Sequence, residues 1–381
     1  MTVNHKKIKI IALFIMFLSA SLLISIPSLL TTFQDVFDLS IGQSSIIPIV
    51  LTLGALVANL LNAFFSAPLG QRTIFRAFFL VSVTSCLVVA FAQTLVVLYP
   101  GLFFLGFAGG LGIAATSTLY SHLPGKSQDF GLYHAAFGLG GILTPLIIGI
   151  LFKKDIRFSC FFTGHSMVTF LSFVSIEIFA TIPNKKYEII RLKEALGIIN
   201  KKYVYLPLLV ITIYAGAENG IINWAGNLFT DEFRYSKDTS SSFLSIFWLV
   251  FTLVRFFTAK FEKMWGFIKT SIIFTWTGII SISLLLLLQA PLFFAFIALS
   301  FAPIFPVMQK YAIKILPKRE VGLLNGLIFA STGITNSVIS GAMGITGDYN
   351  LNISFLIPIL AFISILIILY QLGNIDKQRK I

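Results

Sequence analysis

The stretch YAGAENGIINWAGNLF, residues 214–229, carries Glu218 and three asparagines within a run that is otherwise apolar enough to lie in lipid. A charged side chain at the centre of a membrane-spanning helix costs about 2.5–3.5 kcal/mol on insertion scales. Such a residue needs a partner, a water-filled cavity or a route to the membrane surface. The sequence around this segment decides which of these applies.

The composition of the whole chain indicates an integral membrane protein. Of its 381 residues, 57% are hydrophobic and only 11% are charged, and the mean hydropathy is +0.92. Apolar runs of about 20 residues or more recur along the chain, and each is long enough to cross a hydrocarbon core of about 30 Å as a helix. The alternation typical of a membrane β-barrel is absent, so we expect helical spans.

Charged and turn-rich points divide the chain into twelve candidate helices, which predicts an all-α integral membrane fold. The predicted spans are 8–32, 41–66, 74–92, 95–122, 130–152, 158–182, 203–230, 241–261, 267–288, 291–315, 320–346 and 352–373. A long polar interval separates the sixth span from the seventh. We therefore expect an N-terminal six-helix bundle at 1–183, a cytoplasmic linker at 184–202 and a C-terminal six-helix bundle at 203–381.

The distribution of basic residues orients the spans. The chain has 28 Lys and Arg against 15 Asp and Glu, and most of this excess falls on inner segments when both termini are placed in the cytoplasm, as the positive-inside rule requires. The loop FKKDIRF at 152–158 is an exception. We expect a multi-pass protein of the cell inner (plasma) membrane, a monomer whose basic charge faces lipid headgroups rather than nucleic acid.

Two pairs of segments indicate an internal repeat. Small residues recur at a spacing of four in GILTPLIIG at 141–149 and again in GITNSVISG at 333–341. A similar tetrapeptide precedes each segment, LPGK at 123–126 and LPKR at 316–319. Small residues every four positions are also typical of simple helix packing. Their joint recurrence at nearly one offset favours two related halves.

With twelve spans and this repeat, the chain resembles the major facilitator superfamily, whose transporters have two six-helix halves around a central cavity. The loop AFFSAPLGQR at 63–72 is similar to the family pattern GxxxDRxGx[RK], and it keeps Gly70 and Arg72 but has alanine at the first glycine and at the acidic position. RFFTAKFEKMWG at 255–266 echoes the pattern after the eighth helix. The resemblance implies gating roles for Arg72 and Arg255.

Three stretches are similar to the fucose-permease and sugar-symporter branch. They are GLGGILTPLIIG at 138–149, FAPIFP at 301–306 and GAENGIINW at 216–224, the last of which is similar to the GAExGxxNW pattern of bacterial members. The fucose permease also uses acidic residues in its first and fourth helices, and neither span has one here.

The candidate substrate-binding residues lie on the seventh and eleventh helices. Asn219, Asn223 and Asn227 recur every four residues and form one stripe, beside Trp224, and the eleventh helix contributes Asn336. The resemblance places the seventh helix beside the substrate path. The alternative is that these amides only bond neighbouring helices.

These side chains predict a neutral, polyhydroxylated substrate. Amides donate and accept hydrogen bonds toward hydroxyls, and an indole offers an apolar face to a sugar ring. A strongly anionic substrate would favour Arg or Lys at the same depth, and the predicted spans place none there. We expect a secondary transporter of a small polar solute, a sugar, working by alternating access as a proton symporter with Glu218 as the proton-coupling residue.

An efflux antiporter for lipophilic compounds is the alternative function. Such a transporter favours an aromatic cavity, and the 40 Phe residues are compatible with one. An enzyme is not expected, because the chain has no HExxH, P-loop or paired-acid motif. The sequence predicts no cofactor and no metal site, since the two cysteines have no metal-ligand spacing.

The predicted topology can be tested by cysteine labelling of intact cells. A membrane-impermeant maleimide should miss Lys193→Cys in the central linker and reach Ser240→Cys at the start of the eighth span. Labelling at position 193 would invert the topology.

Overall fold

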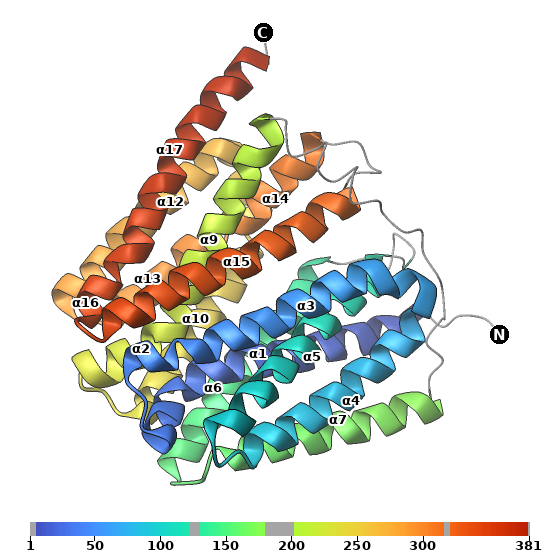
Figure 1. Ribbon diagram of the computed structural model, residues 1–381. Helices are drawn as coiled ribbons and strands as arrows, with labels where there is room; N and C mark the ends of the chain where they lie inside the picture. The colour runs from blue at the N-terminus through green and yellow to red at the C-terminus, as the bar shows by residue number, and fades with distance from the viewer. Residues whose placement is uncertain (1–4, 122, 124–129, 180–201, 316–320, 380–381) are drawn as a thin grey trace. The chain divides into compact units, whose positions relative to one another are not determined.

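The structure is a computed structural model that describes residues 5–121, 123, 130–179, 202–315 and 321–379. Within these ranges the chain forms helices and no strands (Figure 1). A helix satisfies every backbone N–H and C=O inside its own segment, as a chain in lipid must. The predicted all-α membrane fold is confirmed.

The elements follow one another in the order predicted from the apolar runs. They are α1 (His5–Phe37), α2 (Ile41–Ser44), α3 (Ile46–Leu69), α4 (Gln71–Ala90), α5 (Leu95–Ser121), α6 (Phe130–Lys153), α7 (Ser159–Phe179), α9 (Lys202–Asn227), η2 (Leu228–Glu232), α10 (Lys237–Arg255), α11 (Thr258–Trp265), α12 (Phe267–Leu288), α13 (Leu292–Phe301), α14 (Ile304–Ile315), α15 (Val321–Gly347), α16 (Leu351–Ser354) and α17 (Leu356–Arg379).

Ten described helices are long and apolar enough to cross a membrane, or eleven if α10 and α11, bent by 51°, form one span. The predicted span at 320–346 corresponds to α15. The predicted linker at 184–202, including position 193, lies outside the described residues except for Lys202. Ser240 is only 3% exposed. The exposed Lys154, in the loop at 152–158 that the predicted topology places outside, should therefore be labelled more readily than Ser240.

The chain divides into two compact units. The first contains α1 and α3 to α7 together with Ser236–Ser245, and the second contains α2 and the remaining helices from α9 onward. Within the first unit α1 packs against α5 and α6, and within the second α9 packs against α14 and α15. Corresponding spans of the two units therefore make corresponding contacts, as an internal repeat requires.

Two glycines form the same turn in the two units. Gly70 precedes α4 with a φ of 78°, and Gly266 precedes α12 with a φ of 77°. Side chains with a Cβ rarely adopt this left-handed backbone region, so each turn favours glycine. These are the two glycines shared by the loop patterns at 63–72 and 255–266.

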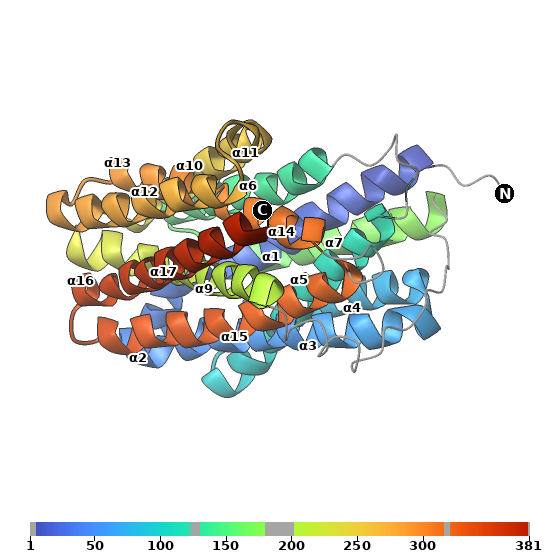
Figure 2. The same cartoon turned by 90° about the horizontal axis from the view of Figure 1, so that it is seen from above.

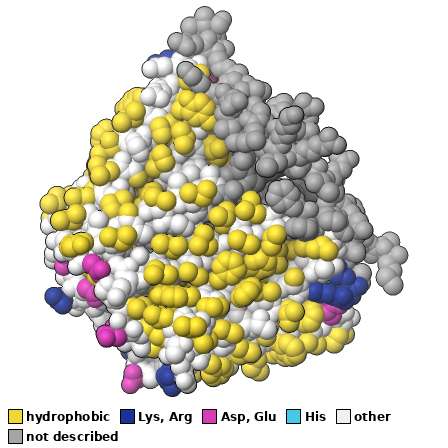
Figure 3. All heavy atoms as spheres, viewed as in Figure 1, with side chains coloured by type: hydrophobic (Ala, Val, Ile, Leu, Met, Phe, Trp, Pro, Cys, Tyr) yellow, Lys and Arg dark blue, Asp and Glu magenta, His cyan; other side chains and the backbone are white. Residues whose placement is uncertain are grey.

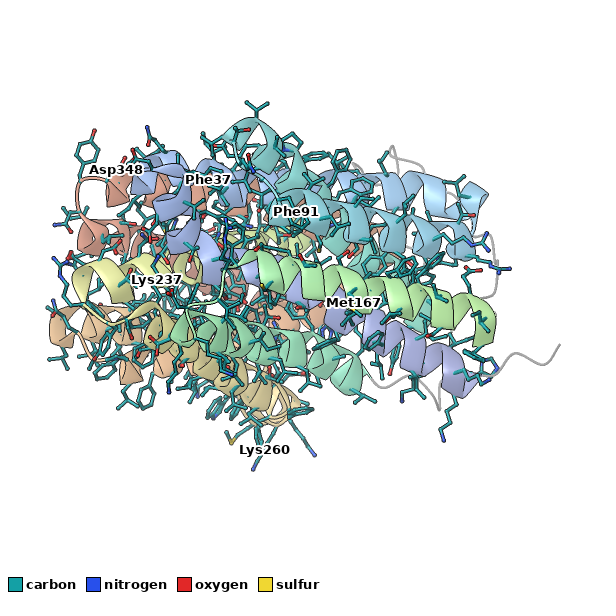
Figure 4. The ribbon with its side chains drawn as sticks, turned by 90° about the horizontal axis from the view of Figure 1, so that it is seen from below. Phe37, Phe91, Met167, Lys237, Lys260 and Asp348 are labelled. Atoms are coloured by element: carbon teal, nitrogen blue, oxygen red, sulfur yellow. The ribbon has the colours of Figure 1, made fainter. Side chains whose placement is uncertain are left out.

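The lipid-facing character of the helices is visible on their surface. Hydrophobic side chains cover the face formed by α3, α4 and α5 (Figure 3). Leu80 on α4 is 66% exposed, and Met167 on the outer side of α7 is 64% exposed (Figure 4). Contiguous apolar surface of this extent is compatible with lipid and not with water.

Helices α9 and α15 lie side by side (Figures 1 and 2) and form a close seam in the second unit. The Thr335 hydroxyl donates a hydrogen bond to the Thr212 carbonyl oxygen at 2.7 Å. A Cβ added to Gly216 would lie 2.8 Å from the Thr335 backbone oxygen, whereas one added to Gly220 would meet the Met343 sulfur at 2.6 Å. The Thr335 oxygen belongs to rigid backbone, whereas the Met343 sulfur belongs to a flexible side chain.

We predict that Gly216→Ala destabilises the protein by about 1–3 kcal/mol, because overpacking forces α9 and α15 apart. Gly220→Ala is the matched control and should cost less, since Met343 can change rotamer. Thermal unfolding of the purified variants in detergent would measure the difference. Equal melting temperatures for the two variants would mean that the seam tolerates a methyl group at both positions.

Candidate functional site

Glu218 lies at the centre of its membrane span. The span runs from Val204 to Glu232, so Glu218 lies fourteen positions from either end, or about 21 Å along the helix axis at 1.5 Å per residue. Among the described residues, it is the one charged side chain more than ten positions from both ends of its span. No route to the membrane surface is available over that distance, so Glu218 depends on protein partners or water.

Two faces of α9 have different surroundings. Gly216 faces α15 in the seam, and Glu218, two residues later, is rotated by about 200° around the helix axis. Tyr214 lies one turn before Glu218 on this second face and is fully buried. Its hydroxyl donates a hydrogen bond to the carbonyl oxygen of Phe301 at 2.8 Å. Phe301 is the last residue of α13, where a helix leaves carbonyl groups without intrahelical partners.

Arg255 is the counter-charge of Glu218. It is the last residue of α10, and its guanidinium carbon lies 4.2 Å from the centre of the Phe251 ring. Arg255 and Tyr214 both contribute to the electrostatic environment of Glu218. The charged atoms of Glu218 and Arg255 do not approach within 4.0 Å, so the two groups form no direct ion pair.

The structure brings Arg255 within electrostatic range of Glu218. The sequence places Arg255 far from Glu218, on the next helix and toward its inner end. In the structure α10 ends at Arg255, where the chain bends by 51° into α11, and the long side chain lies along Phe251. A gating role for Arg255 stays a prediction.

The aromatic side chains around Tyr214 provide an apolar wall. The ring centre of Tyr214 lies 5.7 Å from that of Phe301 and 6.4 Å from that of Phe305, and Phe301 stacks on Phe362 at 4.8 Å. A low local dielectric strengthens the interaction between charges, and it also raises the cost of leaving one unpaired.

The predicted amide stripe makes its hydrogen bonds within the protein. Asn219 Nδ2 donates to the Ala215 carbonyl oxygen at 2.8 Å, and Asn227 Nδ2 donates to the Asp231 carboxylate at 2.8 Å. Both Asn223 and the fully buried Trp224 donate to Ser340 of α15, at 3.0 Å and 2.8 Å. Asn223 and Trp224 therefore act as interhelical contacts here, and substrate binding by the stripe stays a prediction.

Burial distinguishes Glu218 and the first asparagine of the stripe, Asn219, from the later asparagines. From Val210 to Phe229, Glu218 and Asn219 are the polar residues that are only half-buried, whereas Asn223 and Asn227 are buried. Asn336 is half-buried on α15, one turn before Ser340. The structure brings Asn223 to α15 through its hydrogen bond to Ser340.

Arg72 belongs to a separate ionic cluster in the first unit. Its Nη2 donates to Glu177 on α7 at 2.8 Å, and Arg76 adds two hydrogen bonds to the same carboxylate at 2.7 and 2.8 Å. The sequence interpretation missed Arg76, although its spacing of four from Arg72 places both on one face of α4. This contact fixes α4 to α7, and gating by Arg72 stays a prediction.

The described residues contain no group of three or more His, Cys, Asp or Glu that could hold a metal ion. Glu218 supplies a carboxyl, and its neighbours Tyr214, Arg255 and Asn219 supply a phenol, a guanidinium and an amide. This set can bind and release a proton and can hold an anion or a hydroxylated solute.

Comparison with known proteins identifies the fold and the family. Solved structures with the same fold include a bacterial Spinster homologue (TM-score 0.77, 13% identity, 98% of both chains), the nucleoside transporter NupG (0.76, 14%, 96% of this chain and 99% of that one) and a D-xylose-proton symporter (0.74, 14%, 96% and 97%). At these identities the likeness shows the fold alone.

A tetracycline resistance protein, class H, of Pasteurella multocida is 26% identical over 151 residues. The match covers 39% of this chain and 38% of that protein, so most of each sequence lies outside it.

The sequence profile of one family covers far more of the chain. The profile described as Major Facilitator Superfamily matches residues 10–340, a range that includes α9, the bend at Arg255 and both glycine turns. A match over most of the sequence, together with the shared fold, shows that this chain belongs to the Major Facilitator Superfamily.

Proposed function

We propose that the protein is a secondary active transporter that moves a small polar solute, with a sugar as the first candidate, by alternating access and in symport with protons. The observation that carries the proposal is Glu218, a carboxyl at the centre of a span with Arg255 and Tyr214 as its partners. The solved D-xylose-proton symporter has the same fold. The GAENGIINW resemblance to the sugar-symporter branch supports the same substrate class.

The carboxyl of Glu218 can couple proton movement to the conformational change. An ionised carboxylate that moves from water into packed protein loses solvation, whereas the protonated form loses much less. Proton uptake at Glu218 therefore favours a closed site and proton release favours an open one. This dependence links proton movement to the alternation between the two sides of the membrane.

The remaining predicted roles complete the proposal. Half-buried Asn219 and Asn336 are proposed substrate contacts, and Arg72 is proposed to act in gating through its cluster with Glu177. The transporter is proposed to work as a monomer in the inner membrane with both termini in the cytoplasm.

Efflux of lipophilic compounds is the second candidate function. The relation to a tetracycline resistance protein supports it, and so does the abundance of Phe. Uptake of labelled hexoses and pentoses into expressing cells, compared with retention of a lipophilic dye, separates the two candidates. Import predicts sugar accumulation with unchanged dye retention, and efflux predicts the reverse.

We predict that Glu218→Gln uncouples transport from the proton gradient. Glutamine is nearly isosteric with protonated glutamate but cannot titrate, so the variant should mimic the proton-loaded carrier. In proteoliposomes it should keep substrate exchange and lose accumulation driven by a pH gradient. Accumulation by the Gln variant would assign coupling to another group.

Glu232→Gln is the matched control for this experiment. Glu232 is the carboxylate at the end of the same span, and it accepts a hydrogen bond from Asn352 at 2.8 Å. A glutamine can still accept that bond. The control should retain both exchange and accumulation, so that a loss specific to position 218 reports on the central carboxyl.

A further inference from the structure

A cavity of about 420 Å³ lies at one end of the first unit. Its walls come from the last turns of α1, from the loop after α6 and from the start of α10, all of which belong to this unit. The loop is the basic segment at 152–158 that the proposed topology places outside. Small-molecule sites have volumes of roughly 300–1,000 Å³, so the cavity is large enough to hold a ligand.

The loop after α6 has a well-defined backbone. The Asp155 N–H donates to the Phe152 carbonyl oxygen at 3.0 Å, and the Ile156 N–H donates to the Leu151 carbonyl oxygen at 2.9 Å. Asp155 has a φ of 55°, so the helix ends in a turn whose left-handed residue is an aspartate in place of the more usual glycine. This turn places Asp155 and Arg157 in the lining of the cavity.

Two of the charged residues that line the cavity have protein partners. Lys237 (Figure 4) forms an ion pair with Asp35 and donates a hydrogen bond to the Thr31 carbonyl oxygen at 3.3 Å. Asp238, in the first turn of α10, interacts with the Ser236 hydroxyl. The Lys237 contacts fix the start of α10 to the end of α1.

The other two charged residues of the lining form no ion pair. Arg157 and Asp155 have no oppositely charged atom of the described residues within 4.0 Å, and both residues are exposed. An arginine stays protonated and carries a planar fork of donors that fits a phosphate. A carboxylate accepts hydrogen bonds from an ammonium group. A ligand with one anionic and one cationic group therefore complements this pair of side chains.

The second unit contains a counterpart in which the protein itself partners the carboxylate. Asp348 lies 193 positions after Asp155, the same separation as between LPKR and LPGK. Its carboxylate accepts hydrogen bonds from the Ser40 hydroxyl at 2.9 Å and from the Gly42 N–H at 2.7 Å. Gly42 is the second residue of α2, whereas the second residue of α10 is Asp238. The like charge of Asp238 disfavours the same approach by Asp155, which leaves that carboxylate available to a ligand.

The apolar part of the lining favours an amphiphile over a freely soluble solute. Val36 is 54% exposed and Ile156 is 37% exposed, and both line the cavity together with Phe152. Earlier on α6, Ile147 and Ile150 are also exposed, as side chains that face lipid are. Charged groups beside exposed apolar side chains at the end of membrane spans are suited to a phospholipid headgroup.

We propose that this cavity binds the headgroup of a zwitterionic phospholipid, phosphatidylethanolamine, with the phosphate at Arg157 and the ammonium at Asp155. The acyl chains lie against Val36, Ile156 and the exposed face of α6. On the proposed topology the lipid belongs to the outer leaflet, which gives the basic loop on that side a local function. The site is separate from Glu218, which lies in the second unit, and it does not depend on the identity of the transported solute.

Thermal unfolding of the purified protein in detergent would test the ligand class. The probes are dioleoyl phosphatidylethanolamine, dioleoyl phosphatidylglycerol and soluble glycerophosphoethanolamine at matched concentrations. A ligand that binds the folded protein raises the melting temperature. Phosphatidylethanolamine should raise it more than phosphatidylglycerol does, and the soluble headgroup should have little effect. Equal shifts with the two lipids overturn the zwitterionic assignment, and an equal shift with the soluble headgroup overturns the assignment to a lipid.

Two variants and two matched controls separate this site from general effects of lipid. Arg157→Gln and Asp155→Asn should each weaken the affinity for phosphatidylethanolamine by about tenfold, since each loses a charge-assisted hydrogen bond. The affinity follows from the dependence of the melting temperature on lipid concentration. Asparagine tolerates a left-handed backbone, so the turn at position 155 is retained.

The controls remove the same charges from outside the lining. Lys154→Gln removes an exposed cation of the same loop, and Asp38→Asn removes an exposed carboxylate at a residue with a φ of 52° in the loop after α1. Both controls should keep the affinity of the unmodified protein, and melting temperatures without lipid show whether each variant is folded. Unchanged affinity in Arg157→Gln and Asp155→Asn, or an equal loss in the two controls, overturns the proposal.

Discussion

A charge inside a membrane persists only where the protein provides compensation for it, and this constraint organises the second unit. Glu218 lies too far from either end of its span to reach water at the surface. Its compensation comes from a helix that ends at Arg255 and from a buried tyrosine one turn away. The bend between α10 and α11 directly follows Arg255, and the rings of Phe301 and Phe305 lie beside Tyr214.

Helix α9 divides two tasks between two faces. On one face, glycines and short hydroxylated side chains allow α15 to approach closely, and Asn223 and Trp224 bind the Ser340 backbone and side chain. On the other face, Tyr214 and Glu218 meet the neighbouring helices through polar atoms. A rigid seam on one side fixes where the titratable group on the other side can be, which is how a helix positions chemistry without a loop.

The fold was largely predictable from the sequence because apolar runs of membrane length and their charged ends are local features. The turn glycines Gly70 and Gly266 were also visible as shared positions in two loop patterns, and both have the left-handed backbone that their turns need. The approach of Arg255 to Glu218 was not predictable, since it depends on a bend between two helices and on the direction of a long side chain. For Asn223, periodicity indicates which face it occupies but does not distinguish a partner helix from a solute.

The phenol of Tyr214 has one hydroxyl proton, and in the structure the Phe301 carbonyl oxygen accepts it. The same hydroxyl also interacts with the Glu218 carboxyl. An ionised Glu218 would compete with the buried Phe301 carbonyl, at the end of α13, for that single hydrogen atom. One phenol thereby connects the central carboxyl of α9 with a helix end on a different span, at the break between α13 and α14.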